Sequence, residues 1–141
     1  MLQNNINEPS VIDGAVSMER LLGNIPGIVY QFKIDANGVR SLPYASPTTQ
    51  QHIGLSSEEV MSDVEKWFSL THPEDLISLE NSIEESMMNL STWEWVGRFV
   101  VADNDVRWLH GTSTPVRTDD GAVIWDGVFV DVTERKKAEQ E

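Results

Sequence analysis

The last strand-like segment of the chain is the feature that most constrains the fold. Residues 123–130 read Val-Ile-Trp-Asp-Gly-Val-Phe-Val, so Trp125 and Phe129 fall on one face of a strand while Ile124 and Val128 fall on the other. A strand that is apolar on both faces has to be covered on both. Residues 131–140, which follow without Gly or Pro, are charged and rich in good helix formers. The pattern predicts a core strand joined directly to an outgoing helix.

Length, charge and cysteine content exclude several classes of function. The 141 residues are enough for one domain with its own core. A net charge of -13 disfavours binding to nucleic acids or to anionic membranes, and the basic cluster 135–137 is too short to offset it. The absence of cysteine excludes disulfides, thiolate metal sites and cysteine nucleophiles. Because the sequence has neither a signal-peptide pattern nor a membrane span, we expect a cytoplasmic chain.

Periodicity in the first half predicts two strands after a polar lead. Residues 1–16 are polar and aperiodic, which suggests a flexible lead, and residues 17–22 are predicted to form one or two helical turns. Residues 28–34 alternate between apolar and polar side chains, as expected for a strand. Asn37-Gly38 then supplies a tight turn into a second strand at about 39–45.

From residue 46 the pattern changes to helices and then returns to strands. Ser56 and Glu59 fit a capping box at the start of a short helix, and a longer helix is predicted to begin at 71–75. Three strands follow at about 92–102, 106–116 and 122–132, and their short connections favour a meander. The apolar stripe predicted for the long helix consists of Leu76, Leu79, Ile83, Met87 and Leu90.

This order predicts an α+β fold, a five-stranded antiparallel sheet with several helices on one face and a C-terminal exit helix. The doubly apolar last strand requires that the other face of the sheet also be covered. We expect the N-terminal helix or a partner chain to cover it.

Several ordered motifs resemble a PAS domain of the PAS/PAC sensory-box type, as found in bacterial multidomain signalling proteins. The resemblance covers about residues 17–137 and divides the chain into a lead (1–16), a PAS domain (17–133) and the start of a signalling helix or coiled-coil linker (134–141). It implies a sheet cupped around a central cavity, and an exit helix that passes the state of the cavity to an output domain such as a histidine kinase or a diguanylate cyclase. The matching pieces are Leu21-Leu22-Gly23-Asn24-Ile25-Pro26-Gly27-Ile28-Val29-Tyr30, Ser56-Ser57-Glu58-Glu59, His72-Pro73-Glu74-Asp75, Val106-Arg107-Trp108 and Asp131-Val132-Thr133-Glu134-Arg135-Lys136.

A set of bulky apolar side chains is expected to line that cavity. A filled core is the simplest interpretation of these residues, and a small apolar ligand is the alternative, since apolar and aromatic groups also line most ligand pockets. The candidate lining residues are Tyr30, Phe32, Trp67, Met87, Trp95, Phe99, Leu109, Trp125 and Phe129.

The common PAS cofactors are disfavoured. In flavin-binding relatives a cysteine forms the photoadduct and amide side chains hold the flavin edge, but here Glu65 takes the cysteine position. Phe99, Leu109 and Phe129 take the three amide positions, and they cannot satisfy the polar edge of a flavin. Haem-binding relatives use a histidine on the long helix, and residues 74–90 contain none.

The three histidines predict neither a metal site nor a catalytic pair. His72 is expected to cap or pack against the start of the long helix, and its spacing from Asp75 follows from helix-start chemistry alone. His52 and His110 have no partner at metal-ligand spacing. We therefore expect a non-enzymatic domain without a metal, whose ligand the sequence does not identify.

At the exit of the domain, the resemblance assigns a signal relay to three residues. Asp131 and Thr133 are expected to fix the angle between strand and helix, and Arg135 to tie the helix back to the domain. The segment 134–141 is too short to form a stable helix alone. We expect it to continue as a coiled coil in a longer, homodimeric protein with a covalently linked output domain.

The leading hypothesis is therefore a sensory module that senses a small ligand or mediates dimerisation. Two alternatives remain open. One is a small-molecule carrier or enzyme on a similar α+β cone, and the other is a structural interaction domain with a filled core.

Overall fold

A computed structural model describes residues 27–140 and contains one five-stranded antiparallel sheet. The spatial order is β2-β1-β5-β4-β3, so the last strand lies in the middle of the sheet. The expected α+β class and all five expected strands are confirmed. The strands are β1 (Gly27–Ile34), β2 (Arg40–Ala45), β3 (Trp93–Val101), β4 (Asp105–Arg117) and β5 (Val123–Asp131).

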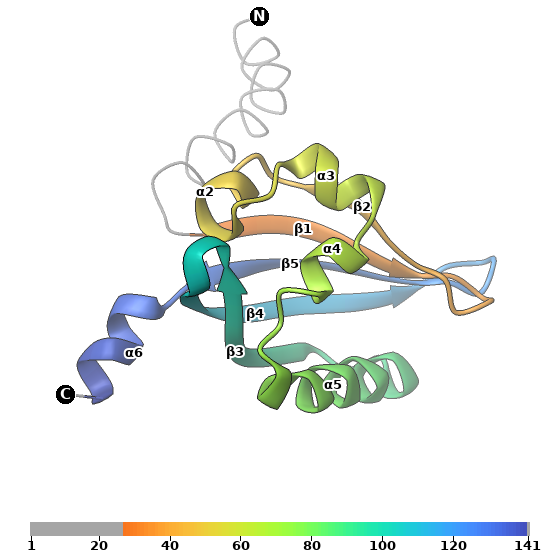
Figure 1. Ribbon diagram of the computed structural model, residues 1–141. Coiled ribbons are helices and arrows are strands. Elements are labelled where there is room, and N and C mark those ends of the chain that lie inside the picture. Colours follow the sequence, from red (N-terminus) through yellow and green to blue (C-terminus); the bar gives the residue numbers. More distant parts are fainter. Residues whose placement is uncertain (1–26, 141) are drawn as a thin grey trace, which may run out of the picture.

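The helices between β2 and β3 lie over one face of the sheet, and the C-terminal helix leaves at one end (Figure 1). This end is opposite to the turns that join β1 to β2 and β4 to β5 (Figure 1). The predicted lead and the predicted helical turns at 17–22 lie outside the described residues. The helices are α2 (Thr49–Ile53), α3 (Ser57–Ser62), α4 (Glu65–Phe68), a 3₁₀ turn (Pro73–Asp75), α5 (Leu76–Asn89) and α6 (Thr133–Gln140).

Local hydrogen bonds explain where these helices begin. The Ser56 hydroxyl accepts a hydrogen bond from the Glu59 backbone N–H at 3.1 Å, and the Ser56 N–H donates to the Glu59 carboxylate at 2.8 Å. This is the predicted capping box. His72 Nδ1 accepts a hydrogen bond from the Glu74 N–H at 3.1 Å, which confirms its predicted capping role.

The predicted apolar stripe of α5 is correct only in its middle. Leu79 and Ile83 are buried, whereas Leu76 and Leu90 are 38% and 42% exposed. Leu90 lies beyond the last turn as a left-handed C-cap with φ of 51°, so its side chain leaves the stripe. The expectation that these two leucines face the core was wrong.

Three serines lie on the side of α5 that faces the sheet, and their contacts were not predicted from the sequence. Ser86 is buried, Ser82 is half-buried and Ser78 is exposed. Ser78, Ser82 and Ser86 are spaced four residues apart and so lie on one helix face. Each accepts a hydrogen bond from an indole N–H. The donors are Trp95 to Ser78 (3.0 Å), Trp93 to Ser82 (2.8 Å) and Trp125 to Ser86 (2.9 Å). We call these six residues the serine–tryptophan ladder.

Removing the most buried member of this ladder is expected to destabilise the domain. Ser86→Ala deletes the acceptor of the Trp125 N–H and the donor to the Ser91 carbonyl. Leaving a buried indole N–H unpaired costs about 1–3 kcal/mol, which chemical denaturation of the purified chain measures. Glu85→Ala, on the exposed side of the same helix, is the control and should change the unfolding free energy by less than about 0.5 kcal/mol. Equal stability of the two variants would contradict this role of the ladder.

The face of the sheet away from the helices is mixed in character. Val96 and Val128 are 38% and 37% exposed there, and His110 bonds Glu94 at 2.9 Å. His110 therefore lies on the outer face. Asp126 adds a charge to the outer side of β5, where it accepts a hydrogen bond from Gln31.

Candidate functional site

A small cavity of about 50 Å³ lies between the sheet and the helices. Its volume is about a third of the ~150 Å³ apolar cavity that accepts benzene in a well-studied protein. The cavity is therefore a modest gap in a packed core. Its walls are formed by Tyr30, Phe32, Leu42, Val64, Trp67, Phe68, Leu79, Ile83, Trp93, Phe99, Ser113, Trp125 and Phe129.

Six of the nine candidate lining residues lie in these walls, namely Tyr30, Phe32, Trp67, Phe99, Trp125 and Phe129. The other three lie elsewhere. Met87 borders a surface groove beside Arg40 and Glu80, because it sits at the edge of the buried side of α5. Trp95 is turned over Gly97, where a Cβ would overlap its ring, and donates to Ser78. Leu109 is fully buried, and in the sheet it pairs with Gly97 and Asp131.

Phe129 is the centre of the aromatic wall. Its ring centroid lies 5.0 Å from Tyr30, 5.2 Å from Trp67, 5.6 Å from Trp93 and 6.3 Å from Phe99. These spacings are in the range of favourable aromatic pairs. Since Phe129 belongs to β5, the aromatic wall is part of the strand that leads to the exit helix.

Glycine at position 111 makes room for this arrangement. Gly111 faces Phe129 in the sheet register, and a Cβ there would overlap the rings of Trp93 and Phe129. A larger side chain would have to displace one of these rings. Gly111 lies inside the strand predicted at 106–116, but the sequence does not show which distant rings pack over it.

Of residues 27–140, those that form the cavity walls include no Asp, Glu, His, Lys or Arg. Among them Tyr30 is the one titratable residue, and burial raises its pKa far above the usual range, although a hydrogen bond with Ser113 acts to lower it. The phenol therefore stays neutral. Within the same part of the chain, the buried Nε1 of Trp67 has no hydrogen-bond partner.

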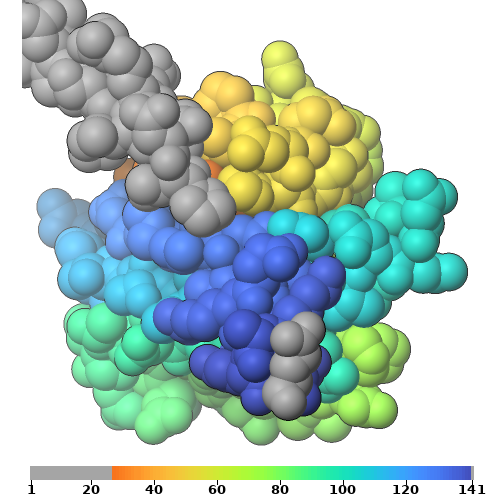
Figure 2. All heavy atoms as spheres, turned by 90° about the vertical axis from the view of Figure 1, so that its left-hand side faces the viewer, coloured from red at the N-terminus to blue at the C-terminus, as the bar shows by residue number. Residues whose placement is uncertain are grey.

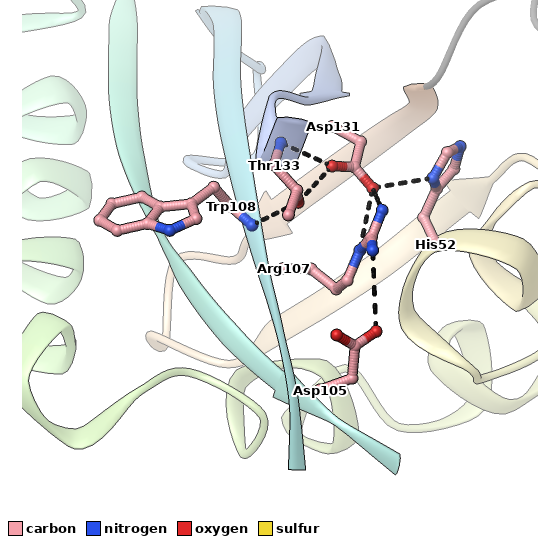
Figure 3. Close-up of polar contacts among 6 residues, drawn as sticks. All are labelled: His52, Asp105, Arg107, Trp108, Asp131 and Thr133. Carbon is pink, nitrogen blue, oxygen red and sulfur yellow. Dashed lines mark hydrogen bonds and ion pairs between the residues drawn. The ribbon is translucent and has the colours of Figure 1, made fainter. Parts of the chain in front are cut away.

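Asp131 forms the second part of the site, at the junction of β5 and α6 (Figure 3). One carboxylate oxygen accepts hydrogen bonds from the Thr133 N–H at 3.0 Å and from the Thr133 hydroxyl at 2.5 Å. The other accepts from Arg107 at 2.6 Å and contacts His52 Nδ1 at 3.4 Å. The carboxylate thus joins α2, β4 and α6, and we call Asp131 with His52, Arg107 and Thr133 the exit clamp.

The electrostatics of the clamp favour the ionised carboxylate. Burial by itself raises the pKa of Asp131, whose side chain is 4% exposed. Hydrogen bonds from His52, Thr133 and Arg107 outweigh burial and hold its pKa well below the usual range. The same pair raises the pKa of Arg107. Both groups therefore remain charged at neutral pH.

Backbone contacts extend the clamp into the exit helix. The Thr133 hydroxyl accepts a hydrogen bond from the Trp108 N–H at 2.9 Å, and the Val132 N–H donates to the Trp108 carbonyl at 2.8 Å. The Lys136 ammonium lies 5.2 Å from the centre of the Trp108 ring. Figure 2 shows α6 projecting from the middle of this end of the molecule, beside the β3–β4 hairpin. An eight-residue helix that is marginal alone is thereby attached to β4.

Arg135 does not have the contact that was expected of it. Its side chain is 60% exposed and approaches Glu139 of the same helix at 4.0 Å, because it points away from the sheet. Arg107 and His52 make the contacts with Asp131 instead. Arg107 lies in the recognised Val106-Arg107-Trp108 motif, whereas His52 is 79 residues from Asp131 and gave no local signal.

Residues 27–140 contain neither a metal-binding cluster nor a membrane-spanning helix. No three His, Asp or Glu side chains in this part of the chain gather closely enough to hold a metal ion. Of the helices that the structure describes, none is both long and apolar enough to cross a membrane.

Comparisons of the chain with family models and with solved structures point to the same family. A family model described as the PAS fold matches residues 42–129. No curated protein sequence matches the chain significantly. Among solved structures, the N-terminal domain of a diguanylate cyclase with PAS/PAC sensor from Marinobacter aquaeolei superposes with a TM-score of 0.65 at 22% identity, covering 78% of this chain and 98% of that one.

Two further structures agree with that fold. A sensory box histidine kinase/response regulator from Burkholderia thailandensis gives a TM-score of 0.63 at 16% identity, covering 87% of this chain and 89% of the other. A PAS domain from Colwellia psychrerythraea gives 0.62 at 13% identity, covering 86% and 98%. At these identities the structural matches establish the fold.

Proposed function

The chain belongs to the PAS family, and we propose that it is a sensory module whose cavity controls an output domain through α6. The main support for this proposal is that β5 connects the cavity directly to the exit clamp. Phe129 lies in the cavity wall, and Asp131, two residues later, holds the exit clamp. A change in the cavity that moves Phe129 therefore acts on the strand that carries the clamp.

The relatives suggest the kind of output. The structures from Marinobacter aquaeolei and Burkholderia thailandensis belong to a diguanylate cyclase and to a histidine kinase/response regulator. We infer that α6 of this chain leads into an output domain of one of these two kinds. We further propose that binding of a small ligand in the cavity is the signal that α6 transmits.

A catalytic role is not part of the proposal. A general acid–base pair needs two ionisable groups that converge on a pocket, and Tyr30, held neutral, is the one titratable residue in the cavity walls. The buried charges of the exit clamp pair with each other and lie outside those walls. This arrangement favours the sensory module over the carrier or enzyme.

We also propose that the outer face of the sheet mediates a homodimer. Val96 and Val128 are 38% and 37% exposed on this face, where His110 and Thr112 of β4 lie between them. Val116 is 56% exposed further along β4, beyond Asp126, so a second copy would meet a mixed surface with separate apolar patches. Analytical ultracentrifugation tests this proposal. A monomer at all concentrations up to the millimolar range would exclude it.

The relay is tested most directly at Thr133. Thr133→Val keeps the shape of the side chain but removes the hydroxyl that bonds Asp131 and Trp108. In a protein that carries this domain together with its output domain, we expect kinase or cyclase activity to change several-fold. Loss of the hydroxyl should lower the unfolding free energy of the domain by only about 1–2 kcal/mol, so the domain stays folded.

The matched control for this experiment is Thr92→Val. Thr92 is exposed in the connection between α5 and β3 and takes no part in the clamp. Its substitution should leave the output unchanged. If Thr133→Val also leaves the output unchanged in a folded protein, the exit clamp is not a relay.

A further inference from the structure

One side chain in the cavity wall reaches the surface of the molecule. Phe68, the last residue of α4, is half-buried, whereas every other wall residue is buried. Its ring packs on Phe32, which also belongs to the wall, with 5.7 Å between the ring centroids. Because Phe68 both lines the cavity and meets solvent, a single ring separates the two at this point.

The guanidinium of Arg40 lies over that ring, 4.0 Å from its centre. Arg40 Nε and Nη2 donate hydrogen bonds to the Glu65 carboxylate at 3.1 and 3.0 Å, and Nη1 donates to Glu80 at 2.8 Å. Arg40 begins β2, Glu65 begins α4 and Glu80 belongs to α5. One side chain thus ties both helices to the sheet where Phe68 closes the cavity.

A surface groove of about 250 Å³ adjoins this contact. Arg40 and Glu80 border the groove, and Ile83 lines both the groove and the cavity. A solute in the groove is therefore one side chain away from the cavity. Movement of Phe68 away from Phe32 would open the wall on this side.

The contacts that hold Phe68 in place are suited to opening and closing. The side chains of Arg40, Glu65 and Glu80 are 22%, 57% and 42% exposed, and ion pairs with such exposure are individually weak. The guanidinium–ring contact adds a further modest attraction. With four residues, α4 is too short to be stable by itself, so these contacts help to decide its position.

We propose that Phe68 is the gate through which small solutes enter the cavity and that Arg40 is the latch that keeps this gate closed. The inference rests on the proposed sensory function, because it gives the ligand of that function a route of entry. Arg40, Glu65 and Glu80 all lie outside the cavity walls. The latch therefore controls how fast a ligand exchanges, and it has little influence on how tightly the ligand binds.

Xenon is the probe for this proposal, because it is uncharged and enters small apolar cavities. The affinity of the 141-residue chain for xenon is read from the methyl shifts of the wall residues Val64, Leu79 and Ile83. The exchange rate between free and bound xenon is read from ¹²⁹Xe spectra.

Three variants separate the latch from its surroundings. Arg40→Met keeps an apolar stem beside Phe68 and removes the hydrogen bonds to both glutamates. Glu80→Gln removes the charge of one partner and leaves β2 and α4 unchanged. Glu84→Gln makes the same change one helical turn further on at the same groove, and it is the matched control because Glu84 is not a partner of Arg40.

Arg40→Met is expected to raise the rates of xenon entry and release together by about 3–10-fold, and to change the dissociation constant by less than about twofold. Glu80→Gln should give a smaller rise in both rates, and Glu84→Gln should give none. Raising NaCl from about 0.05 M to about 1 M should speed exchange in the wild type, because salt screens the ion pairs. Arg40→Met should not respond to salt.

Two results would overturn the gate alone while xenon still binds. One is exchange at the wild-type rate in Arg40→Met, and the other is an equal rise in Glu80→Gln and Glu84→Gln. Absence of xenon binding to the wild type would overturn the gate together with the proposal of a ligand in this cavity. The Thr133→Val experiment measures output without any ligand, so failure of the gate is distinguishable from failure of the relay.

Discussion

Asp131→Asn is expected to release α6 from the domain. The substitution removes the charge that pairs with Arg107 and offers the Thr133 N–H, the Thr133 hydroxyl and His52 a weaker or misoriented group. Breaking a fully buried ion pair costs about 3–5 kcal/mol. Arg107 is 27% exposed, so we expect roughly 2–3 kcal/mol here and a fall in Tm of about 5–10 °C. Hydrogen exchange should show lost protection in residues 133–140 before the core is affected.

Asp126→Asn provides the matched control for Asp131→Asn. It makes the same change on the same strand, but Asp126 is exposed on the outer face and bonds only Gln31. The control should lower Tm by no more than about 2 °C and leave α6 protected. If both variants behave alike, the clamp does not hold the helix.

The difference in unfolding free energy between the wild type and Asp131→Asn should depend on pH in a defined direction. Asp131 has a folded-state pKa below that of the unfolded chain, so its ionised form stabilises the fold. The contribution is complete above the ordinary carboxyl pKa of about 3.9 and is lost as the pH falls from there towards the depressed value. The gap in unfolding free energy between the wild type and Asp131→Asn should therefore be constant above about pH 5 and shrink in acid.

Phe129→Ala is expected to be the most destabilising single change in the cavity wall. It deletes the ring that packs against Tyr30, Trp67, Trp93 and Phe99. Truncation of a buried phenylalanine costs about 3–5 kcal/mol, because lost burial and a new cavity add together. Thermal unfolding should show a fall in Tm of about 10 °C or more.

The enlarged cavity gives this prediction a second measurement. With the ring removed, benzene should bind and raise Tm with the logarithm of its concentration once the site is largely filled, while the wild type should not respond. Asp126→Ala, three residues away on the exposed side of the same strand, is the control for a truncation in β5. Destabilisation without any response to benzene would mean that neighbouring rings collapse into the space.

Features with a local signature were predictable from the sequence. The alternation at 28–34, the Ser56–Glu59 capping box and the Asp131–Thr133 motif all appear as expected. Contacts between distant residues were not predictable. The hydrogen bond from Trp125 to Ser86 spans 39 positions and the His52–Asp131 contact spans 79, and neither has a periodic pattern to reveal it.

The residues whose predicted positions were wrong also depend on contacts that are not local in the sequence. Parity assigns a side chain to one face of a strand, but it does not say how far along the sheet the cavity extends. Trp95 and Leu109 are buried and yet lie outside the cavity walls. Arg135 is at the predicted position in the chain, but rotation about the helix axis directs it to Glu139.

The serine–tryptophan ladder also limits which parts of the domain can move. Its serines repeat every four residues, about one turn of helix, and their three partners are buried indoles on β3 and β5. A small glide of α5 along the sheet would break all three bonds together, and the next position that restores any of them is four residues along the helix, about 6 Å away. The three hydrogen bonds therefore hold α5 in one position relative to the sheet. Trp125 ties β5 to the same helix, so any motion that the proposed sensory function requires is left mainly to α4, which carries Trp67.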